Sequence, residues 1–106
     1  MQYKLLGNTG VKVSTLCYGT MSFGGDADEA TSAAMFHRCR EVGINFFDSA
    51  NVYSQGRSEE ILGKLIADCR DDVIITSKVF GQMGQEMNAR GSSRRNIHLA
   101  VEATLK

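Results

Sequence analysis

Three side chains in the sequence combine acid–base chemistry with related positions. Asp48 lies near the end of the apolar run INFFDSA (44–50), Tyr53 follows five positions later, and Lys78 lies near the end of DVIITSKVF (72–80). If the two runs are neighbouring parallel strands, side-chain alternation puts Asp48 and Lys78 on one face at the same edge of the sheet. A carboxylate and an ammonium would pair there, and an ammonium beside a phenol makes the phenol a stronger acid. Tyr53 would then act as a general acid that gives a proton to a carbonyl oxygen.

A simpler interpretation of the same spacing involves no catalysis. An aspartate and a lysine at strand ends often form a solvent-exposed ion pair that contributes little to stability. A tyrosine in the following loop often serves only to pack against its neighbours. The residue types and their spacing leave both interpretations open.

The first part of the chain predicts a small hairpin and a strand. The segments YKLLG (3–7) and VKVST (11–15) alternate apolar and polar residues and are joined through GNTG (7–10). Glycine and asparagine tolerate the positive φ angles that tight turns require. An apolar strand follows from about residue 14 to 21 and leads into a glycine-containing loop.

A first helix is expected between this strand and the next. Asp26 or Asp28 can cap it, Glu29 favours its first turn, and Gly43 is the expected residue after its C-cap. The predicted apolar stripe consists of Ala30, Ala33, Ala34, Met35, Phe36 and Val42.

The strand–helix pattern then repeats twice. After the strand at 44–50, Ser58 is expected to cap a helix that runs through Ile61, Leu62, Leu65 and Ile66 to about Cys69. After the strand at 72–80 and a loop at 81–91, Ser92 or Ser93 begins a third helix. Its apolar positions are Ile97, Leu99, Ala100, Val101 and Leu105.

Strands that alternate with helices predict an α/β fold with a parallel sheet and right-handed crossovers. Three strand–helix units in 106 residues match about the first three-eighths of a (β/α)8 barrel, which needs about 250 residues. The helical pattern also continues to Lys106 without a terminating signal. We therefore expect residues 1–106 to be the N-terminal part of a single barrel domain, truncated after the third unit. A doubly wound open sheet is the alternative.

The composition excludes several classes of partner. Twelve basic and twelve acidic residues cancel without a block of like charge, so neither nucleic acid nor a membrane surface is an expected partner. Cys17, Cys39 and Cys69 are widely spaced, which predicts neither a zinc site nor a disulfide framework. No apolar stretch suits a signal peptide or a membrane span, and we expect a cytoplasmic protein. The sequence carries no signal for an oligomeric state.

Four long segments resemble the aldo-keto reductase family. They are LGNTGVKVSTLCYGTMSFGG (6–25), GINFFDSANVYSQGRSEEILGKLI (43–66), VIITSKV (73–79) and RGSSRRNIHLAVEATLK (90–106), and they cover nearly the whole chain in order. The resemblance implies a TIM barrel with a β-hairpin closing its bottom. It also implies reversible NADPH-dependent reduction of small aldehydes and ketones, without a metal.

The resemblance also implies roles for individual residues. Tyr53 matches the family's proton donor, Lys78 the lysine that tunes it, and Asp48 the aspartate that holds this lysine and contributes to the cofactor site. Gly19, Thr20 and Met21 match the segment that lies against the nicotinamide side of the cofactor. NADPH rests on the resemblance alone, because GTMSFGG (19–25) is neither a P-loop nor a G-x-G-x-x-G fingerprint.

The family's fourth catalytic residue, usually a histidine, belongs to a strand beyond Lys106. His37 and His98 do not replace it, because both fall within predicted helices and are expected on their surfaces. Phe23 and Phe80 follow strand ends, where they either wall a substrate pocket or join the core. The loop at 81–91 is expected to help select the substrate, as loops on that rim of a barrel do.

Two other functional hypotheses remain beside the enzyme. Potassium-channel β subunits share the fold and a similar N-terminal sequence, which implies a cofactor-binding regulatory subunit. The other hypothesis is an inactive truncated fragment, because three units without the rest of a barrel would expose sheet edges and an apolar face.

Overall fold

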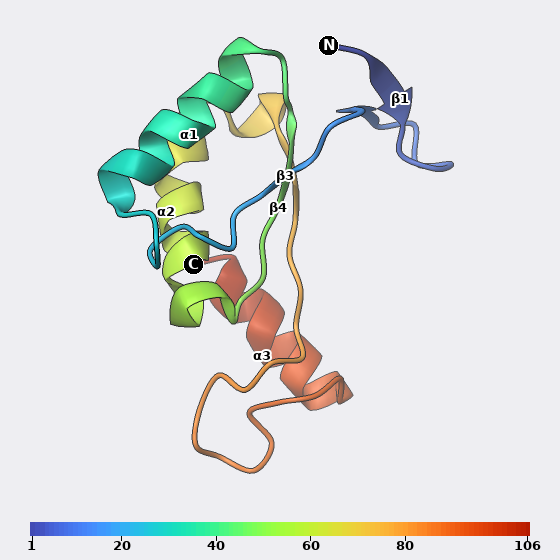
Figure 1. The fold of residues 1–106 in the computed structure, drawn as a ribbon. Coiled ribbons are helices and arrows are strands. Elements are labelled where there is room, and N and C mark those ends of the chain that lie inside the picture. The colour runs from blue at the N-terminus through green and yellow to red at the C-terminus, as the bar shows by residue number, and fades with distance from the viewer.

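The computed structural model describes residues 1–106 as a hairpin followed by three strand–helix units (Figure 1). The elements are β1 (Tyr3–Leu5), β2 (Lys12–Ser14), β3 (Tyr18–Gly19), α1 (Glu29–Glu41), β4 (Phe46–Asp48), the short 3-10 helix η1 (Tyr53–Gly56), α2 (Arg57–Ile66), the 3-10 helix η2 (Arg70–Asp72), β5 (Ile74–Thr76) and α3 (Arg94–Thr104). The predicted alternation of strands and helices is confirmed. No helix combines the length and the apolar character that a membrane crossing needs.

The three later strands form one parallel sheet in the order β3-β4-β5. Its register sets Gly19 beside Asp48, and Asp48 beside Thr76. The strands are shorter than predicted, since β4 covers three of the seven residues at 44–50. Apolar character marks which residues are buried, whereas the strand bounds include only the residues in regular ladder pairing. The hairpin of β1 and β2 forms a separate antiparallel sheet.

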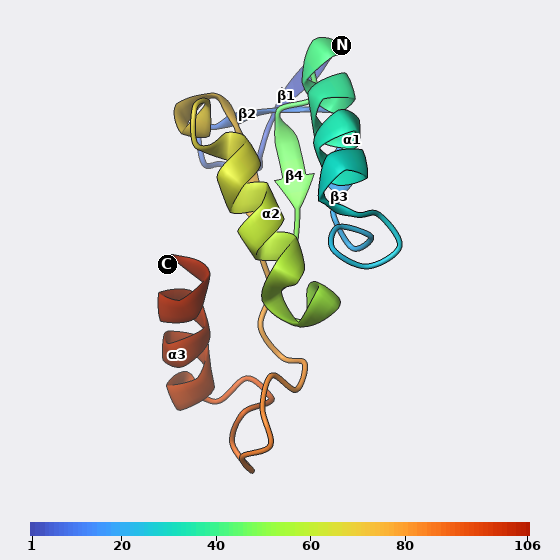
Figure 2. The same cartoon turned by 90° about the vertical axis from the view of Figure 1, so that its left-hand side faces the viewer.

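Helices α1 and α2 cover the same face of the sheet (Figure 2). Phe47 points into this layer and is completely buried, and its ring centroid lies 5.0 Å from that of Phe36 on α1. Ile61 and Leu62 of α2, together with Phe23, complete the centre of this core. Burying each such side chain stabilises the fold by about 1.5–3 kcal/mol. Phe23 is therefore a core residue, which decides between the two roles expected for it.

Helix α1 begins as predicted but buries a different face. The Asp28 side chain accepts a hydrogen bond from the Thr31 amide at 2.8 Å, which confirms the predicted cap. The buried residues are Ser32, Phe36 and Cys39, while three residues of the predicted stripe, Ala30, Ala34 and Val42, are exposed. Alanine is only weakly apolar and favours a helix on either face. The positions of the alanines therefore did not indicate which face of α1 is buried.

The N-cap predicted for α2 is wrong. The helix starts at Arg57 after Gly56, whose φ of 94° suits glycine. Ser58 lies inside the helix, and its buried hydroxyl donates to the Thr20 carbonyl at 2.7 Å. The Ser58 hydroxyl therefore bonds to a distant carbonyl instead of capping the helix as the local sequence pattern had predicted.

Helix α3 starts where predicted, but its apolar residues are not in the core. Ser93 caps it by accepting from the Asn96 amide at 3.1 Å. Figure 1 shows most of α3 beyond the carboxyl edge of the sheet. Four of its predicted apolar positions are accordingly exposed, namely Ile97, Leu99, Val101 and Leu105.

The hairpin is attached to the sheet chiefly by one side chain. The Asn45 carboxamide accepts from the Ser14 amide at 2.7 Å and donates to the Lys12 carbonyl at 3.2 Å. Tyr3 adds an exposed bond, because its hydroxyl donates to the Gly43 carbonyl at 2.8 Å. Asn45 thus satisfies backbone groups of β2 that the hairpin alone leaves unpaired.

Replacing Asn45 should loosen the hairpin. We expect Asn45→Ala to lower the free energy of unfolding by about 1–3 kcal/mol, because it leaves the buried Ser14 amide without its acceptor. Tyr3→Phe should cost about 1 kcal/mol or less, since its bond is exposed. Urea titration of the whole protein gives both values, and equal values for the two variants would contradict this account of Asn45.

Candidate active site

Asp48, Tyr53 and Lys78 come together at the carboxyl edge of the sheet. The Asp48 carboxylate accepts from Lys78 Nζ at 2.6 Å and from Thr76 Oγ1 at 2.7 Å, one bond to each oxygen. The predicted meeting of Asp48 and Lys78 on one face is therefore present in the structure. The bond from Thr76 to Asp48 was not predicted from the sequence. Thr76 stands directly opposite Asp48 in the parallel register.

The Lys78 ammonium is fully engaged. Its three donors reach Asp48 Oδ2 at 2.6 Å, the Ser49 carbonyl at 2.7 Å and Tyr53 Oη at 3.1 Å. Nζ also lies 4.8 Å from the centre of the Tyr53 ring. Because Tyr53 Oη accepts from an ammonium, its own hydrogen remains available for another acceptor. The arrangement can deliver a proton from the phenol to a bound oxygen.

The two charged groups stabilise each other's ionised forms. Burial opposes ionisation of Asp48, but hydrogen bonds from Lys78 and Thr76 outweigh it and hold the pKa of this carboxyl below its usual value. Burial likewise opposes the charge on Lys78, but Asp48 and Tyr53 outweigh it and raise the pKa of the ammonium. The side chains remain 32% and 49% exposed, so a molecule from solution can reach the pair.

The backbone after Tyr53 is strained. Ser54 and Gln55 adopt left-handed conformations with φ of 48° and 54°, which costs about 1–3 kcal/mol each for residues other than glycine. This turn leads the chain directly from Tyr53 into α2. The Tyr53 amide donates to the Ala50 carbonyl at 3.1 Å, and the Asn51 amide donates to the Lys78 carbonyl at 3.2 Å. The loop is thereby held over the end of β5.

The segment Gly19–Met21 lies beside Asp48, with its side chains in different surroundings. Gly19 is exposed, and a Cβ placed on it would meet no atom within 4 Å. Met21 is 69% exposed. The Thr20 side chain is buried instead, and its hydroxyl lies 2.9 Å from Ser58 Oγ on α2. Gly19 and Met21 are open to a ligand, whereas the Thr20 hydroxyl belongs to the scaffold.

The other candidates do not join this cluster. His37 and His98 are exposed on α1 and α3, as expected for residues on helix surfaces. Phe80 is also exposed, two residues beyond Lys78. No group of three or more His, Cys, Asp and Glu side chains is placed to hold a metal ion.

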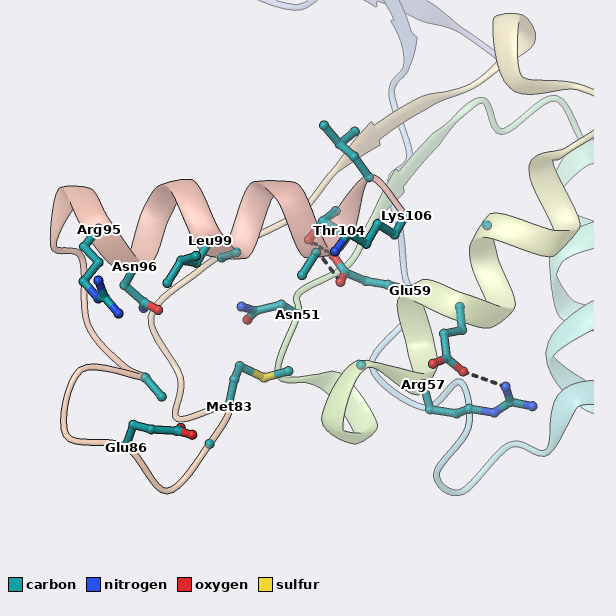
Figure 3. A pocket seen from close by; sticks show the side chains of 18 of the residues that line it. Asn51, Arg57, Glu59, Met83, Glu86, Arg95, Asn96, Leu99, Thr104 and Lys106 are labelled. Carbon is teal, nitrogen blue, oxygen red and sulfur yellow. Dashed lines mark hydrogen bonds and ion pairs between the residues drawn. The ribbon is translucent and has the colours of Figure 1, made fainter.

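A large cavity lies apart from this cluster. It has a volume of about 1140 Å³ between α2, the 81–91 loop and α3, and Asp48, Tyr53 and Lys78 do not line it (Figure 3). Asn51 lines it and is buried, with its side-chain oxygen unpaired. The cluster of Asp48, Tyr53 and Lys78 and this cavity are therefore separate features.

Removing the Asp48 charge should flatten the acid side of the stability profile. A carboxyl with a lowered folded pKa adds stability above its unfolded pKa of about 4 and loses it as pH falls through the folded value. In the whole protein, we expect Asp48→Asn to abolish this part of the fall in Tm between about pH 5 and pH 2. The control is Asp71→Asn, an exposed position without an ion pair. An unchanged acid slope in Asp48→Asn would contradict the coupling.

Known proteins resemble both the sequence and the structure. The chain is 43% identical over 110 residues to a protein of Oryza sativa subsp. japonica named "Probable voltage-gated potassium channel subunit beta", covering 100% of this chain and 33% of that protein. It is 37% identical over 117 residues to norsolorinic acid reductase of Aspergillus flavus, covering 96% and 30%. Among solved structures, the holo form of aldo-keto reductase AKR11C1 from Bacillus halodurans superposes with a TM-score of 0.87 at 33% identity, covering 99% of this chain and 35% of that one.

These likenesses settle the architecture. The chain spans about a third of the length of the curated relatives it matches. Its fold is the N-terminal portion of the (β/α)8 barrel of these enzymes, with the leading hairpin, and not a doubly wound sheet. The family model for aldo/keto reductases matches residues 15–106. With this match and the oxidoreductases among its relatives, the chain belongs to the aldo/keto reductase family.

Proposed function

We propose that the whole protein is an NADPH-dependent oxidoreductase that reduces aldehydes or ketones to alcohols. Residues 1–106 would form the N-terminal part of its single barrel domain. The observation that carries the proposal is the Lys78 ammonium, which contacts both the Asp48 carboxylate and the Tyr53 hydroxyl. A salt bridge between Asp48 and Lys78 would not require a tyrosine beside it. A tyrosine that acts as a proton donor, in contrast, requires a nearby ammonium to stabilise its phenolate.

In this mechanism Tyr53 is the general acid. A substrate carbonyl oxygen would accept the free hydrogen of Tyr53 Oη while negative charge develops on that oxygen. Lys78 stabilises the phenolate that Tyr53 becomes, and Asp48 with the Ser49 carbonyl keeps the ammonium in place. When bound, NADPH supplies the hydride to the carbonyl carbon.

The residues beside the acid fit the nicotinamide end of this cofactor. Gly19 leaves open space next to Asp48, and Met21 offers an exposed apolar side chain on the same segment. A flat nicotinamide ring can lie against a stretch of backbone that no side chain obstructs. Thr20 would contribute through its main chain, because its hydroxyl bonds within the scaffold.

A cofactor-binding regulatory subunit is the second candidate. The likeness to the rice protein named as a potassium channel β subunit covers the whole chain and favours it. Both candidates would bind NADPH, so turnover discriminates between them. Slow carbonyl reduction with tight NADPH binding would favour the regulatory subunit.

Tyr53→Phe in the whole protein tests the enzyme. We expect kcat for carbonyl reduction to fall by about 10²–10⁴-fold, because the general acid is lost. The affinity for NADPH, measured by fluorescence titration, should stay within about twofold, since the ring and the Lys78–Asp48 pair remain. Tyr3→Phe makes the same chemical change in the hairpin and should leave kcat unaltered. Undiminished reduction by Tyr53→Phe would refute the role of Tyr53.

Residues 1–106 expressed alone should not reduce carbonyls. Leu99 and Val101 of α3 and Leu105 at its C-cap are exposed, and β3 and β5 each have an unpaired edge. Such surfaces promote association, so we expect aggregation or a broad thermal transition. Light scattering and an NADPH oxidation assay check this. A monomer that melts cooperatively and oxidises NADPH in the presence of an aldehyde would contradict it.

A further inference from the structure

The first turn of α2 contacts the residue that follows each strand of the parallel sheet. Ser58 Oγ donates to the Thr20 carbonyl after β3 at 2.7 Å and lies 3.4 Å from Ser49 Oγ after β4. Glu59 Oε1 accepts from Ser77 Oγ after β5 at 2.5 Å. Ser49 immediately follows Asp48 in the chain, and Ser77 immediately precedes Lys78. A single helical turn is therefore bonded to all three strand ends at the candidate site.

We propose that Glu59 is a positioning residue for the reaction, which holds the Lys78 ammonium against Tyr53 by anchoring Ser77. The inference rests on the proposed reductase function and deepens it. Glu59 does not contact Asp48, Tyr53 or the Lys78 side chain by any hydrogen bond, so it would act through the strand end.

The strand end that carries Lys78 needs such an anchor. Strand β5 ends at Thr76, two residues before Lys78. Backbone bonds from β4 and its following loop hold one edge, where the Ser49 amide donates to the Thr76 carbonyl and the Asn51 amide to the Lys78 carbonyl. Ser77 and Val79 flank Lys78 in the sequence. Their only side-chain hydrogen bond is the one from Ser77 to Glu59 on α2. Because successive side chains point to opposite faces, fixing Ser77 toward α2 fixes Lys78 toward Tyr53.

The Glu59 carboxylate is itself well held. Thr104 Oγ1 on α3 lies 3.0 Å from Oε1 and 3.2 Å from Oε2, and Figure 3 shows this contact between the two helices. Hydrogen bonds to an ionised acceptor are stronger than neutral ones, and a carboxylate is favoured in the first turn of a helix. Glu59 thus joins α2, the end of β5 and α3 through one half-buried group.

Glu60 provides a matched control on the same turn. It is exposed, and its carboxylate pairs with Arg57 at 2.8 Å without contacting any strand end. Glu60→Gln removes the same charge from the same turn of α2. Any effect specific to Glu59→Gln must therefore come from the contacts to Ser77 and Thr104.

The test uses Ser77→Ala and Glu59→Gln in the whole protein, with kcat and the KM for NADPH measured for each variant. We expect each variant to lower kcat by about tenfold with the KM for NADPH unchanged, because small displacements of reacting groups are costly. Ser77→Thr, which keeps the hydroxyl, should restore kcat. Loss of Tm with unchanged kcat, or the same fall of kcat in Glu60→Gln, would overturn the proposal.

A second readout does not require reductase activity. The contacts with Asp48 and Tyr53 raise the pKa of Lys78, and titration of its ammonium by NMR follows these contacts directly. In Ser77→Ala this pKa should fall toward the ordinary lysine value. An unmoved titration would overturn the positioning role even if Tyr53→Phe had established the reductase. Active Tyr53→Phe with a shifted Lys78 titration would instead refute the catalytic role and leave the anchor standing.

Discussion

The Lys78 ammonium is the interaction on which the candidate site depends. Its three protons are shared among the Asp48 carboxylate, the Ser49 carbonyl and the Tyr53 hydroxyl. These acceptors come from the end of β4 and from the loop that follows it, while the ammonium comes from beyond β5. Since an ammonium has no fourth donor, any group that binds at Tyr53 must meet the phenol rather than the lysine. The geometry thereby leaves the hydrogen of the Tyr53 hydroxyl free while all three donors of Lys78 are occupied.

The alternation of side chains along β4 separates the core from the site with few residues. Phe47 faces α1 and α2 and is completely buried, while its neighbour Asp48 faces the opposite side and pairs with Lys78. Ser77 and Lys78 repeat the arrangement, one bonded to α2 and the other to the site. One face packs against the helices, while the carboxyl end of the other face presents Asp48, Thr76 and Lys78. A shift of one residue in register would exchange them and destroy both.

The order of elements and the Asp48–Lys78 contact could be predicted from the sequence because both follow from local rules. Strand periodicity placed Asp48 and Lys78 on matching faces, and the caps at Asp28 and Ser93 followed from short polar side chains before helical segments. The buried face of α1 and the role of Ser58 could not be predicted. Each depends on which neighbour the folded chain brings near, and the acceptor of the Ser58 hydroxyl lies 38 residues away. The catalytic roles of Asp48, Tyr53 and Lys78 remain predictions. The cofactor-binding roles of Gly19, Thr20, Met21 and Asp48 also remain predictions.

The rim of the sheet is held by a different force from its core. Phe36, Phe47 and Ile61 pack without polar partners, so their contribution depends on volume and tolerates little change. At the rim, Ser58 and Glu59 hold the strand ends through directed hydrogen bonds. Such bonds position atoms precisely while each adds only about 1 kcal/mol to stability, or about 1.5–3 kcal/mol where the acceptor is charged. A substitution at the rim can therefore move the Lys78 side chain at a small cost in stability, whereas a large-to-small substitution in the core costs about 2–5 kcal/mol. The geometry of the site and the stability of the fold thus depend on different residues.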